Sequence, residues 1–367
     1  MATSLITGGC GFIGRALARE LQAHGQEVRV LDALLPQVHA GSRPDMPDVE
    51  IIEGDIRDAE AVRKAVRGVD GVFHLAAEVG VGQSMYEIAR YTATNDLGTA
   101  VLLEALIAEP VPRLVLASSM SVYGEGLYRD AKGEAVRHAR RTTGDLEAGR
   151  WDPVDAGGAP LTPVPTPEDK PVDLASIYAL TKFAQERAVL IFGANYPTET
   201  VALRLFNVFG PGQALSNPYT GVLANFGSRI INGRPATVFE DGRQMRDFVH
   251  VEDVARAFRL AMEQQPAAGH VINIGSGGTY SIASVAEMLA GALGRPDLKP
   301  EILNRARSGD IRHNFPDLSK ARELLGFRAE KRLENAMDDL AAWIASETAV
   351  DRGAEMRREL EVRGLVR

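Results

Sequence analysis

The sequence predicts an α/β fold, built on a doubly wound parallel sheet that is joined to a smaller α/β domain. Strand-like apolar runs alternate with helical stretches over the first 205 residues, a pattern that indicates βαβ units. A glycine-rich segment, residues 7–14, directly follows the first apolar run. The chain of 367 residues is also long enough to bury more than one hydrophobic core.

The expected elements follow one another in a regular order. Strands are expected at residues 5–7, 27–31, 49–53, 72–75, 114–117 and 200–205, and helices at residues 59–66, 87–107 and 177–192. Ligands of such sheets bind outside the carboxyl ends of the strands. Small or polar residues stand at these ends, namely Gly8, Asp32, Asp55, Ala76, Ser119 and Asn207. A ligand site is therefore expected at this edge of the sheet.

The glycine-rich segment fits a turn that binds the phosphates of a dinucleotide. Gly8 allows a tight turn, Gly11 removes a side chain where a pyrophosphate would approach, and Gly14 lets the next helix pack on its strand. The N-terminus of that helix presents free N–H groups to the phosphates. An ordinary tight turn is the alternative, but the position directly after a first strand favours the dinucleotide.

An acidic residue ends the second expected strand. Asp32 lies 18 residues after Gly14, near the spacing at which a carboxylate accepts hydrogen bonds from the adenosine ribose. Because a carboxylate there repels a 2′-phosphate, NAD is favoured over NADP. The alternative is a solvated aspartate in a turn.

The composition excludes several classes of function. A net charge of −8 makes nucleic acid an unfavourable partner, and no apolar run reaches the roughly 18 residues that a membrane span needs. The single cysteine, Cys10, cannot form an internal disulfide, which fits a reducing, cytoplasmic location. Because the N-terminus enters the first strand at once, no signal peptide is expected. No metal site is expected either.

One long segment interrupts the alternation of strands and helices. Residues 125–174 are rich in glycine and proline, which predicts a long insertion with little regular structure. A loop of this length is usually functional or disordered. Trp151 indicates that part of the insertion packs on the rest of the molecule, near the mouth of the active site. A surface excursion is the alternative.

These patterns divide the chain into regions. Residues 1–206 are expected to form the cofactor-binding domain, including the insertion at about 125–174, and residues 247–275 are expected to return to this domain. A smaller substrate-binding domain is expected from residues 207–246 and 276–346. The tail, residues 347–367, is expected to be a peripheral helix or a frayed end.

A tyrosine and a lysine form the second strong signal. Tyr178 and Lys182 are four residues apart in an expected helix, so they share one face. A nearby cation favours the phenolate and lowers the pKa of a tyrosine, which would make Tyr178 a base usable near neutral pH. Ser119, at the end of a parallel strand, can hydrogen-bond a substrate hydroxyl or carbonyl. An exposed helix pair and a serine-rich turn are the alternatives.

With these residues in view, the chain resembles the extended short-chain dehydrogenase/reductases, in the branch of nucleotide-sugar epimerases and dehydratases. The resemblance covers residues 3–345. The motifs that carry it are residues 7–14, 54–58, 74–77, 118–124, Tyr178 with Lys182, 203–211 and 246–251. It implies a Rossmann fold, NAD as cofactor and a nucleotide-diphosphate sugar as substrate.

The resemblance also implies roles for individual residues. Ser119, Tyr178 and Lys182 would be catalytic. Cofactor contacts are implied for Gly8, Gly11, Phe12, Ile13, Gly14, Asp32, Asp55, Ile56, Leu75, Ala76, Ala77, Asn95, Tyr178, Lys182, Phe206 and Val208. Substrate contacts are implied for Ser84, Ser119, Asn207, Phe239, Arg246 and Arg307. Arg246 and Arg307 would hold the diphosphate and Phe239 the nucleobase, whereas ion pairs with Asp247 or Asp310 are the alternative for the arginines.

Within this branch, the residues favour a 4-epimerase. Related 4,6-dehydratases carry an Asp-Glu pair after the catalytic residue, but here Met120 and Ser121 stand there, so no acid is available for water elimination. The resemblance of residues 118–126 and 216–222 points to a dTDP-6-deoxyhexose such as dTDP-L-rhamnose. UDP-glucose or UDP-glucuronate 4-epimerisation, a ketosugar reductase and a non-catalytic NAD-binding regulator stay open. The family further implies a homodimer, formed through helices 87–107 and 177–192.

Overall fold

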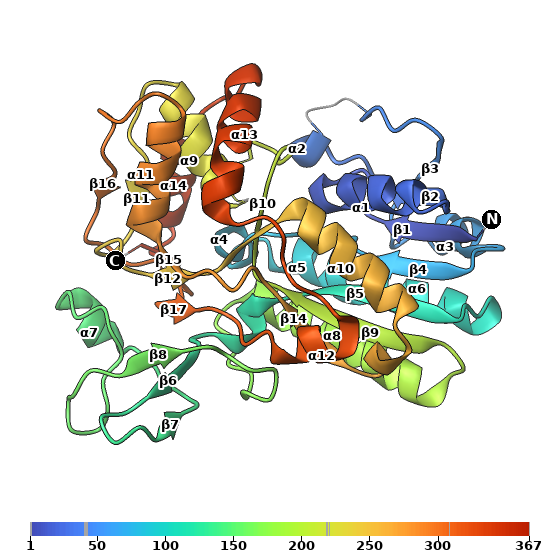
Figure 1. Cartoon of the computed structure of the whole chain (residues 1–367), viewed down its shortest axis with the longest axis horizontal. Coiled ribbons are helices and arrows are strands. Elements are labelled where there is room, and N and C mark those ends of the chain that lie inside the picture. Colours follow the sequence, from blue (N-terminus) through green and yellow to red (C-terminus); the bar gives the residue numbers. More distant parts are fainter. Residues whose placement is uncertain (1, 40–42, 218, 220, 308, 367) are drawn as a thin grey trace.

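A parallel sheet forms the centre of the computed structural model, which describes residues 2–39, 43–217, 219, 221–307 and 309–366 (Figure 1). Among these residues the sheet has seven strands in the order β14-β9-β5-β4-β1-β2-β3. Their bounds are β1 (Thr3–Thr7), β2 (Glu27–Asp32), β3 (Val49–Glu53), β4 (Gly71–His74), β5 (Arg113–Ser119), β9 (Glu199–Leu205) and β14 (Val271–Ile274). The predicted α/β class is confirmed.

Helices cover both faces of this sheet because its strands are apolar on both sides. On one face lie α1 (Phe12–Ala23), α10 (Val251–Glu263) and α12 (Ser319–Leu325), which bury Leu17, Phe258 and Leu325. On the other lie α3 (Ala59–Val66), α6 (Gly98–Ala108) and α8 (Ile177–Asn195). The chain leaves β1 toward β2 and later returns on its other side as β4, which creates a crevice at the ends of β1 and β4.

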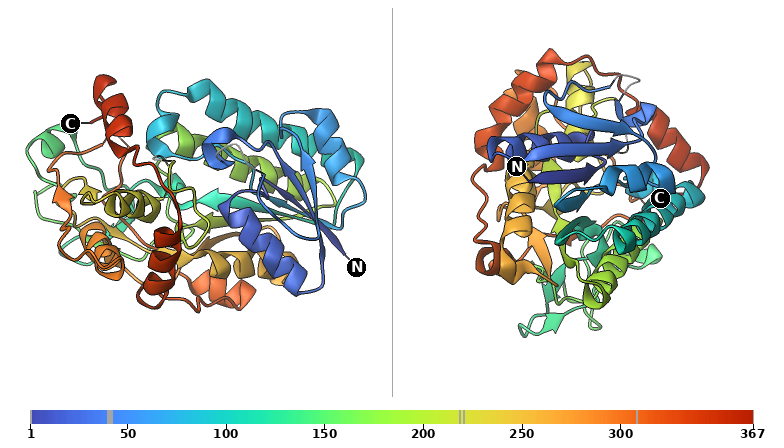
Figure 2. Two further views of the ribbon diagram at one scale, coloured as in Figure 1. Left: turned by 90° about the horizontal axis from the view of Figure 1, so that it is seen from above. Right: turned by 90° about the vertical axis from the view of Figure 1, so that its right-hand side faces the viewer.

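A second hydrophobic core lies beyond the carboxyl ends of the strands. It is formed by α9 (Val222–Ile231), α11 (Ile282–Ala292) and α13 (Leu333–Ser346). Figure 2 shows these helices at the opposite end of the molecule from the β1–β3 edge. Short strands surround them: β10 (Asn207–Phe209) with β13 (Phe248–His250), β11 (Thr237–Val238) with β16 (Glu301–Ile302), and β12 (Met245–Arg246) between β15 (Tyr280–Ser281) and β17 (His313–Asn314).

The stretch expected as one helix at residues 87–107 is divided into three parts. They are α5 (Ile88–Tyr91), a π-helical segment (Thr92–Leu97) and α6. The wider π-helical turn contains Asn95, whose side chain bonds to the main chain of Glu78 and to Thr181 of α8. These bonds depend on tertiary contacts, so the apolar periodicity that predicts the helix does not reveal them.

The insertion contains more regular structure than its composition predicts. It forms a small antiparallel sheet of β6 (Leu127–Arg129), β7 (Ala135–Val136) and β8 (Thr162–Val164). The short helix α7 (Thr143–Glu147), between β7 and β8 in the chain, lies at the edge of the molecule in Figure 1. Tyr128 is fully buried in this sheet and packs with Ala139 and Leu161. A local core of this kind holds short strands that turn residues alone would not indicate.

The tail forms the helix α14 (Gly353–Val362), which packs on the rest of the chain through one apolar face. Met356, Leu360 and Val366 bury their side chains against Tyr86, Tyr219 and Phe239. The other positions of the helix are mostly charged. No helix among the described residues is long and apolar enough to cross a membrane.

Candidate active site

The turn after β1 requires glycine at two of the predicted positions. Gly8 has a φ of +70°, and a Cβ there would lie 2.8 Å from the main chain of Ala76. A Cβ on Gly14 would lie 2.5 Å from Cα of Gly9. Gly11 is the N-cap of α1 and, having no side chain, leaves the first N–H groups at Phe12 and Ile13 free for an anion. The turn therefore fits the pyrophosphate of a dinucleotide.

Asp32 is buried at the end of β2, directly beside this turn. It is 8% exposed, and its oxygens accept hydrogen bonds from the N–H of Cys10 (2.9 Å) and of Leu34 (2.9 Å). Nε2 of His39 lies 3.4 Å from Oδ1 of Asp32. Asp32 is therefore buried and hydrogen-bonded, and it is not exposed to solvent in a turn. The thiol of Cys10 is buried as well, and burial together with Asp32 raises its pKa to about 12.

The other predicted cofactor residues line the carboxyl edge of the sheet. Leu75 and Ala76 donate their N–H groups to Thr7 (3.1 and 3.2 Å), which ties the ends of β4 and β1 together, and Ala77 follows them. Ile56 is buried against Gly98. The carboxylate of Asp55 is bound by the guanidinium of Arg57, which lowers its pKa.

Three predicted contact residues have structural partners instead. The side chain of Asn95 is fully buried and bonds to the main chain of Glu78 and to the hydroxyl of Thr181. Phe206 is buried with Val122 and Tyr123. The hydroxyl of Ser84 is also fully buried, because it donates to the carbonyl of Val81 (2.7 Å) and accepts the N–H of Tyr178 (3.0 Å).

Val208, another predicted cofactor residue, lies away from the glycine turn in the sequence. It lies in β10, is partly buried against the main core and pairs with Val249 of β13. The hydroxyl of Ser84 anchors the N-terminus of α8, and its contact with a substrate stays a prediction.

Ser119, Tyr178 and Lys182 lie where β5 and α8 meet. Ser119 ends β5 and accepts hydrogen bonds from the N–H (3.2 Å) and the hydroxyl (2.9 Å) of Ser121. Burial raises the pKa of Tyr178, and a hydrogen bond with Ser119 lowers it. Tyr178 also packs edge-on against the ring of Tyr91, with 6.5 Å between the centroids.

Lys182 does not bond to the phenol in this structure. Its ammonium group donates to Oε1 of Gln185 at 2.7 Å, and burial lowers its pKa to about 7. The expected lowering of the Tyr178 pKa by Lys182 is therefore wrong for this arrangement. The reason is that the buried amine faces Gln185 and that desolvation disfavours both charged forms.

A cavity of about 310 Å³ separates this edge from the second core. Four of the predicted substrate residues line it, namely Asn207, Phe239, Arg246 and Arg307, together with Met120 and Ser121. Oδ1 of Asn207 is buried and has no hydrogen-bond partner among the described residues. The cavity is thus lined by residues from both parts of the molecule.

The two predicted diphosphate ligands have different surroundings. Arg307 donates both arms of its guanidinium to Asp310 (2.9 and 3.1 Å) and stacks 4.5 Å from the ring centroid of Phe239. Arg246 donates to the carbonyls of Met245 and Arg312, both at 2.9 Å, and burial lowers its pKa. In this structure Arg307 is therefore paired with Asp310.

Asp247 does not pair with Arg246. Its carboxylate accepts the N–H groups of Ser276 (2.7 Å) and Gly277 (2.6 Å). The guanidinium of Arg246 is held by main-chain carbonyls, and no carboxylate of the described residues lies within bonding distance of it.

Several cavity-lining residues were not predicted. They are Met85, Tyr219, Asn225, Arg229, Gln244, Met356, Arg357, Leu360 and Leu365. Met356, Arg357, Leu360 and Leu365 belong to the tail. The i, i+4 spacing of Met356 and Leu360 in an otherwise charged stretch is the one signal that could have indicated a docked helix.

The sequence of the chain matches a protein family and several curated relatives. Residues 4–143 and 156–275 match a family described as the NAD dependent epimerase/dehydratase family. The chain is 36% identical over 350 residues to the dTDP-L-rhamnose 4-epimerase of Burkholderia thailandensis, covering 94% of this chain and 95% of that protein. It is 28% identical to the UDP-glucose 4-epimerase of Corynebacterium glutamicum, covering 97% and 99%.

The fold of the chain is also similar to that of a solved structure. The structure of MoeE5 in complex with UDP-glucuronic acid and NAD superposes with a TM-score of 0.76 at 30% identity, covering 93% of this chain and 98% of that one. The likeness extends over both halves of the molecule.

Proposed function

The chain belongs to the NAD dependent epimerase/dehydratase family, and we propose that it is a nucleotide-sugar 4-epimerase that works with bound NAD. The observation that carries this proposal is the position of Tyr178 and Ser119. Ser119 ends β5 at the carboxyl edge of the sheet, directly before Met120 and Ser121, which line the cavity, and Tyr178 is hydrogen-bonded to Ser119. The 4-epimerases of Burkholderia thailandensis and Corynebacterium glutamicum match nearly the whole chain.

The residues of the site have distinct tasks in this proposal. NAD, which the glycine turn and Asp32 would hold, would supply the hydride chemistry at C4 of the sugar. Tyr178 takes the proton of the 4-hydroxyl as the 4-keto sugar forms and gives it back afterwards, and Ser119 holds the same oxygen by a hydrogen bond. Lys182 would hold the ribose of the nicotinamide nucleotide. Because the sugar must turn over, its ring is held loosely.

The nucleotide, in contrast, is held firmly. Arg246 and Arg307 supply cations for the diphosphate, and guanidinium groups suit this role because they form forked hydrogen bonds to phosphate oxygens. For Arg307, this requires that the diphosphate compete with Asp310. Phe239 is the surface for the nucleobase, and Asn207 offers an unpaired side-chain oxygen to the substrate.

The substrate we propose is a dTDP-6-deoxyhexose such as dTDP-L-rhamnose. The relative with 36% identity is a dTDP-L-rhamnose 4-epimerase. UDP-glucose and UDP-glucuronate are the alternatives, since relatives and a solved neighbour carry these names. Dehydration is disfavoured, because Met120 and Ser121 provide no acid beside the sugar.

A homodimer is proposed on the basis of exposed apolar side chains. Ile88, Leu97, Ile107, Leu180 and Ile191 are between 48% and 56% exposed, and they lie on the α5–α6 stretch and on α8. Pairing of these helices between two copies would cover them. Light scattering after gel filtration measures the mass and tests this state. We also propose a cytoplasmic location, in keeping with the single buried thiol.

The activity is tested by incubating the pure protein with dTDP- and UDP-sugars without added cofactor. Nuclear magnetic resonance then follows the configuration at C4. An epimerase interconverts two C4 epimers without consuming NADH, whereas a ketosugar reductase consumes added NADH stoichiometrically. Absence of inversion with every sugar removes the proposal.

A further inference from the structure

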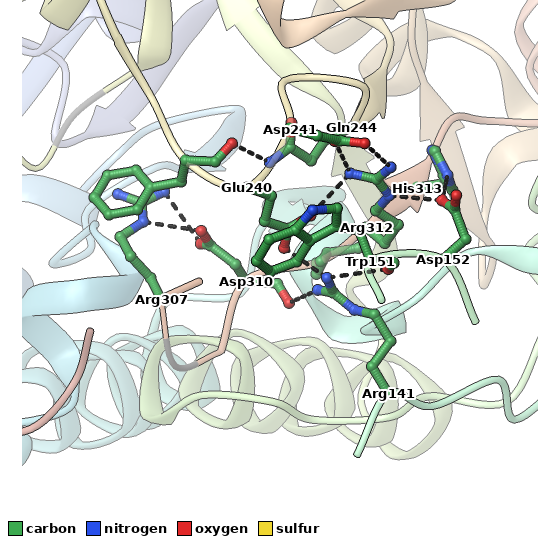
Figure 3. Close-up of polar contacts among 12 residues, drawn as sticks. Arg141, Trp151, Asp152, Glu240, Asp241, Gln244, Arg307, Asp310, Arg312 and His313 are labelled. Carbon is green, nitrogen blue, oxygen red and sulfur yellow. Dashed lines mark hydrogen bonds and ion pairs between the residues drawn. The ribbon is translucent and has the colours of Figure 1, made fainter. Parts of the chain in front are cut away.

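A buried arginine connects the insertion to the wall of the substrate cavity. Arg141 belongs to the insertion, and its side chain is 5% exposed. Its guanidinium donates to Oε1 of Glu125 (3.1 Å), to Oε1 of Glu240 (2.5 Å) and to the main-chain carbonyl of Asp310 (2.8 Å), as Figure 3 shows for the latter two. One side chain thus joins three separate segments of the chain.

Two of these partners are next to residues of the proposed nucleotide site. Glu240 directly follows Phe239, and Asp310 binds Arg307 through its carboxylate. Glu240 is fully buried and has a φ of +52°, a region that residues with side chains rarely adopt. Its main chain bonds to Arg305 and Asn304 at 2.9 and 3.0 Å, so the two loops are linked to each other as well.

Arg312 completes the network from the other side. It donates to Oε2 of Glu240 (3.0 Å), to Asp241 (2.6 and 3.0 Å) and to Asp152 of the insertion (2.7 Å). The carboxylate of Glu240 is therefore shared by two arginines. Removal of one partner from such a buried set leaves the other charges uncompensated.

The loop that carries Arg307 has open space on both sides. Arg307, Gly309, Asp310 and Ile311 line the substrate cavity, and they also line a second cavity of about 410 Å³ that faces the insertion. The packing behind these residues is therefore incomplete. The bond from Arg141 to the carbonyl of Asp310 crosses this second space.

We propose that Arg141 is a positioning residue for nucleotide-sugar binding: it fixes Asp310 and Glu240, and through them Arg307 and Phe239. This inference rests on the proposed function, because it assigns Arg307 to the diphosphate. In this proposal the insertion stabilises the part of the cavity wall that binds the nucleotide.

The test compares Arg141→Ala with Arg140→Ala, a neighbouring arginine whose side chain is 73% exposed and pairs with Asp173. Calorimetry measures the affinities for UDP and dTDP, and steady-state assays measure KM and kcat. We expect Arg141→Ala to weaken nucleoside diphosphate binding and raise KM by about tenfold or more, with kcat changed less than about threefold. Arg140→Ala should stay within about twofold of the wild type in each.

A double-mutant cycle separates positioning from a general loss of stability. In an Arg307→Ala background, Arg141→Ala should weaken binding by clearly less than it does in the wild type, because one of the two residues it acts through is absent. An equal loss in both backgrounds overturns the inference. So does a variant that lowers the melting temperature and kcat together while KM stays unchanged.

Arg141→Lys keeps the test decisive if the alanine variant does not fold. Lysine retains the charge beside Glu240 but lacks the fork that also reaches Asp310, so we expect binding between that of the wild type and that of the alanine variant. Wild-type affinity in this variant counts against the inference. Failure of the wild-type protein to bind either nucleotide would instead remove the proposed function, so the two failures are distinguishable.

Discussion

The ammonium group of Lys182 donates a hydrogen bond to Oε1 of Gln185, with 2.7 Å between the two atoms on adjacent turns of α8. Gln185 in turn donates to the hydroxyl of Thr99 at 2.7 Å, and the ring of His74 bonds to Thr99 and Thr7. Burial and Lys182 lower the pKa of His74 to about 3, so the ring is neutral. This buried polar chain fixes the amine of Lys182 at the end of the sheet, one turn from Tyr178.

Replacement of Tyr178 by phenylalanine should abolish epimerisation without changing the fold. The ring remains for packing against Tyr91, but the group that takes the proton is removed. We expect kcat to fall by about 10²- to 10⁴-fold. Nuclear magnetic resonance of the sugar products measures this loss, and the NAD content of the purified variant serves as the control. Retention of full activity would favour a regulatory protein over an enzyme.

Replacement of Ser119 by alanine should shift the pH profile as well as the rate. The hydrogen bond from Ser119 lowers the pKa of Tyr178, so its loss raises that pKa. Because Tyr178 acts as a base when deprotonated, the limb on which kcat/KM rises with pH moves to higher pH, and the rate near neutral pH falls about 10²-fold. An unchanged profile in the variant would show that Ser119 does not act on the phenol.

Replacement of Lys182 by methionine should change how stability depends on pH. Burial lowers the pKa of Lys182 from 10.5 to about 7, so between these values the unfolded chain binds more protons than the folded one. The stability of the wild type relative to the variant therefore rises with pH across this window, by roughly 1.4 kcal/mol for each unit of pKa difference, and is constant below it. Denaturant titrations at several pH values measure the difference, and a flat difference contradicts the prediction.

Replacement of Asp32 by asparagine should weaken the preference for NAD. The variant keeps the size of the side chain and an oxygen for the N–H of Cys10, but loses the charge that repels a 2′-phosphate. We expect NAD to bind about 10- to 100-fold more weakly, since bonds to a charged group contribute about 1.5–3 kcal/mol. Fluorescence titration with NAD and NADP measures both affinities. An unchanged ratio would mean that Asp32 serves only the turn.

Replacement of Leu360 by aspartate should open the wall that α14 provides. Leu360 is 2% exposed and lines the cavity, whereas Val362 on the same helix is 79% exposed. A buried carboxylate without a partner is unfavourable, so the helix should detach and KM should rise by about tenfold. Val362→Asp is the matched control and should behave like the wild type. Equal KM values for both variants would show that the helix is irrelevant to binding.

The sequence predicts the parts of the site that depend on local geometry. Gly8 and Gly14 are required by the turn itself, and Tyr178 and Lys182 by the helical repeat. The roles of Ser84 and Asn95 could not be predicted, because their partners are more than ten residues away in the chain and are brought together only by folding. The same holds for Arg141, whose partner Asp310 is 169 positions distant.

Cys10 has a practical consequence for work with this protein. The residue is 1% exposed, and burial raises the pKa of its thiol. At neutral pH it therefore holds almost no thiolate, which is the form that attacks alkylating reagents and peroxide. Because this is the one sulfhydryl in the chain, folded samples should tolerate air and storage without dithiothreitol. Labelling by maleimide would then report unfolding of the first βα unit.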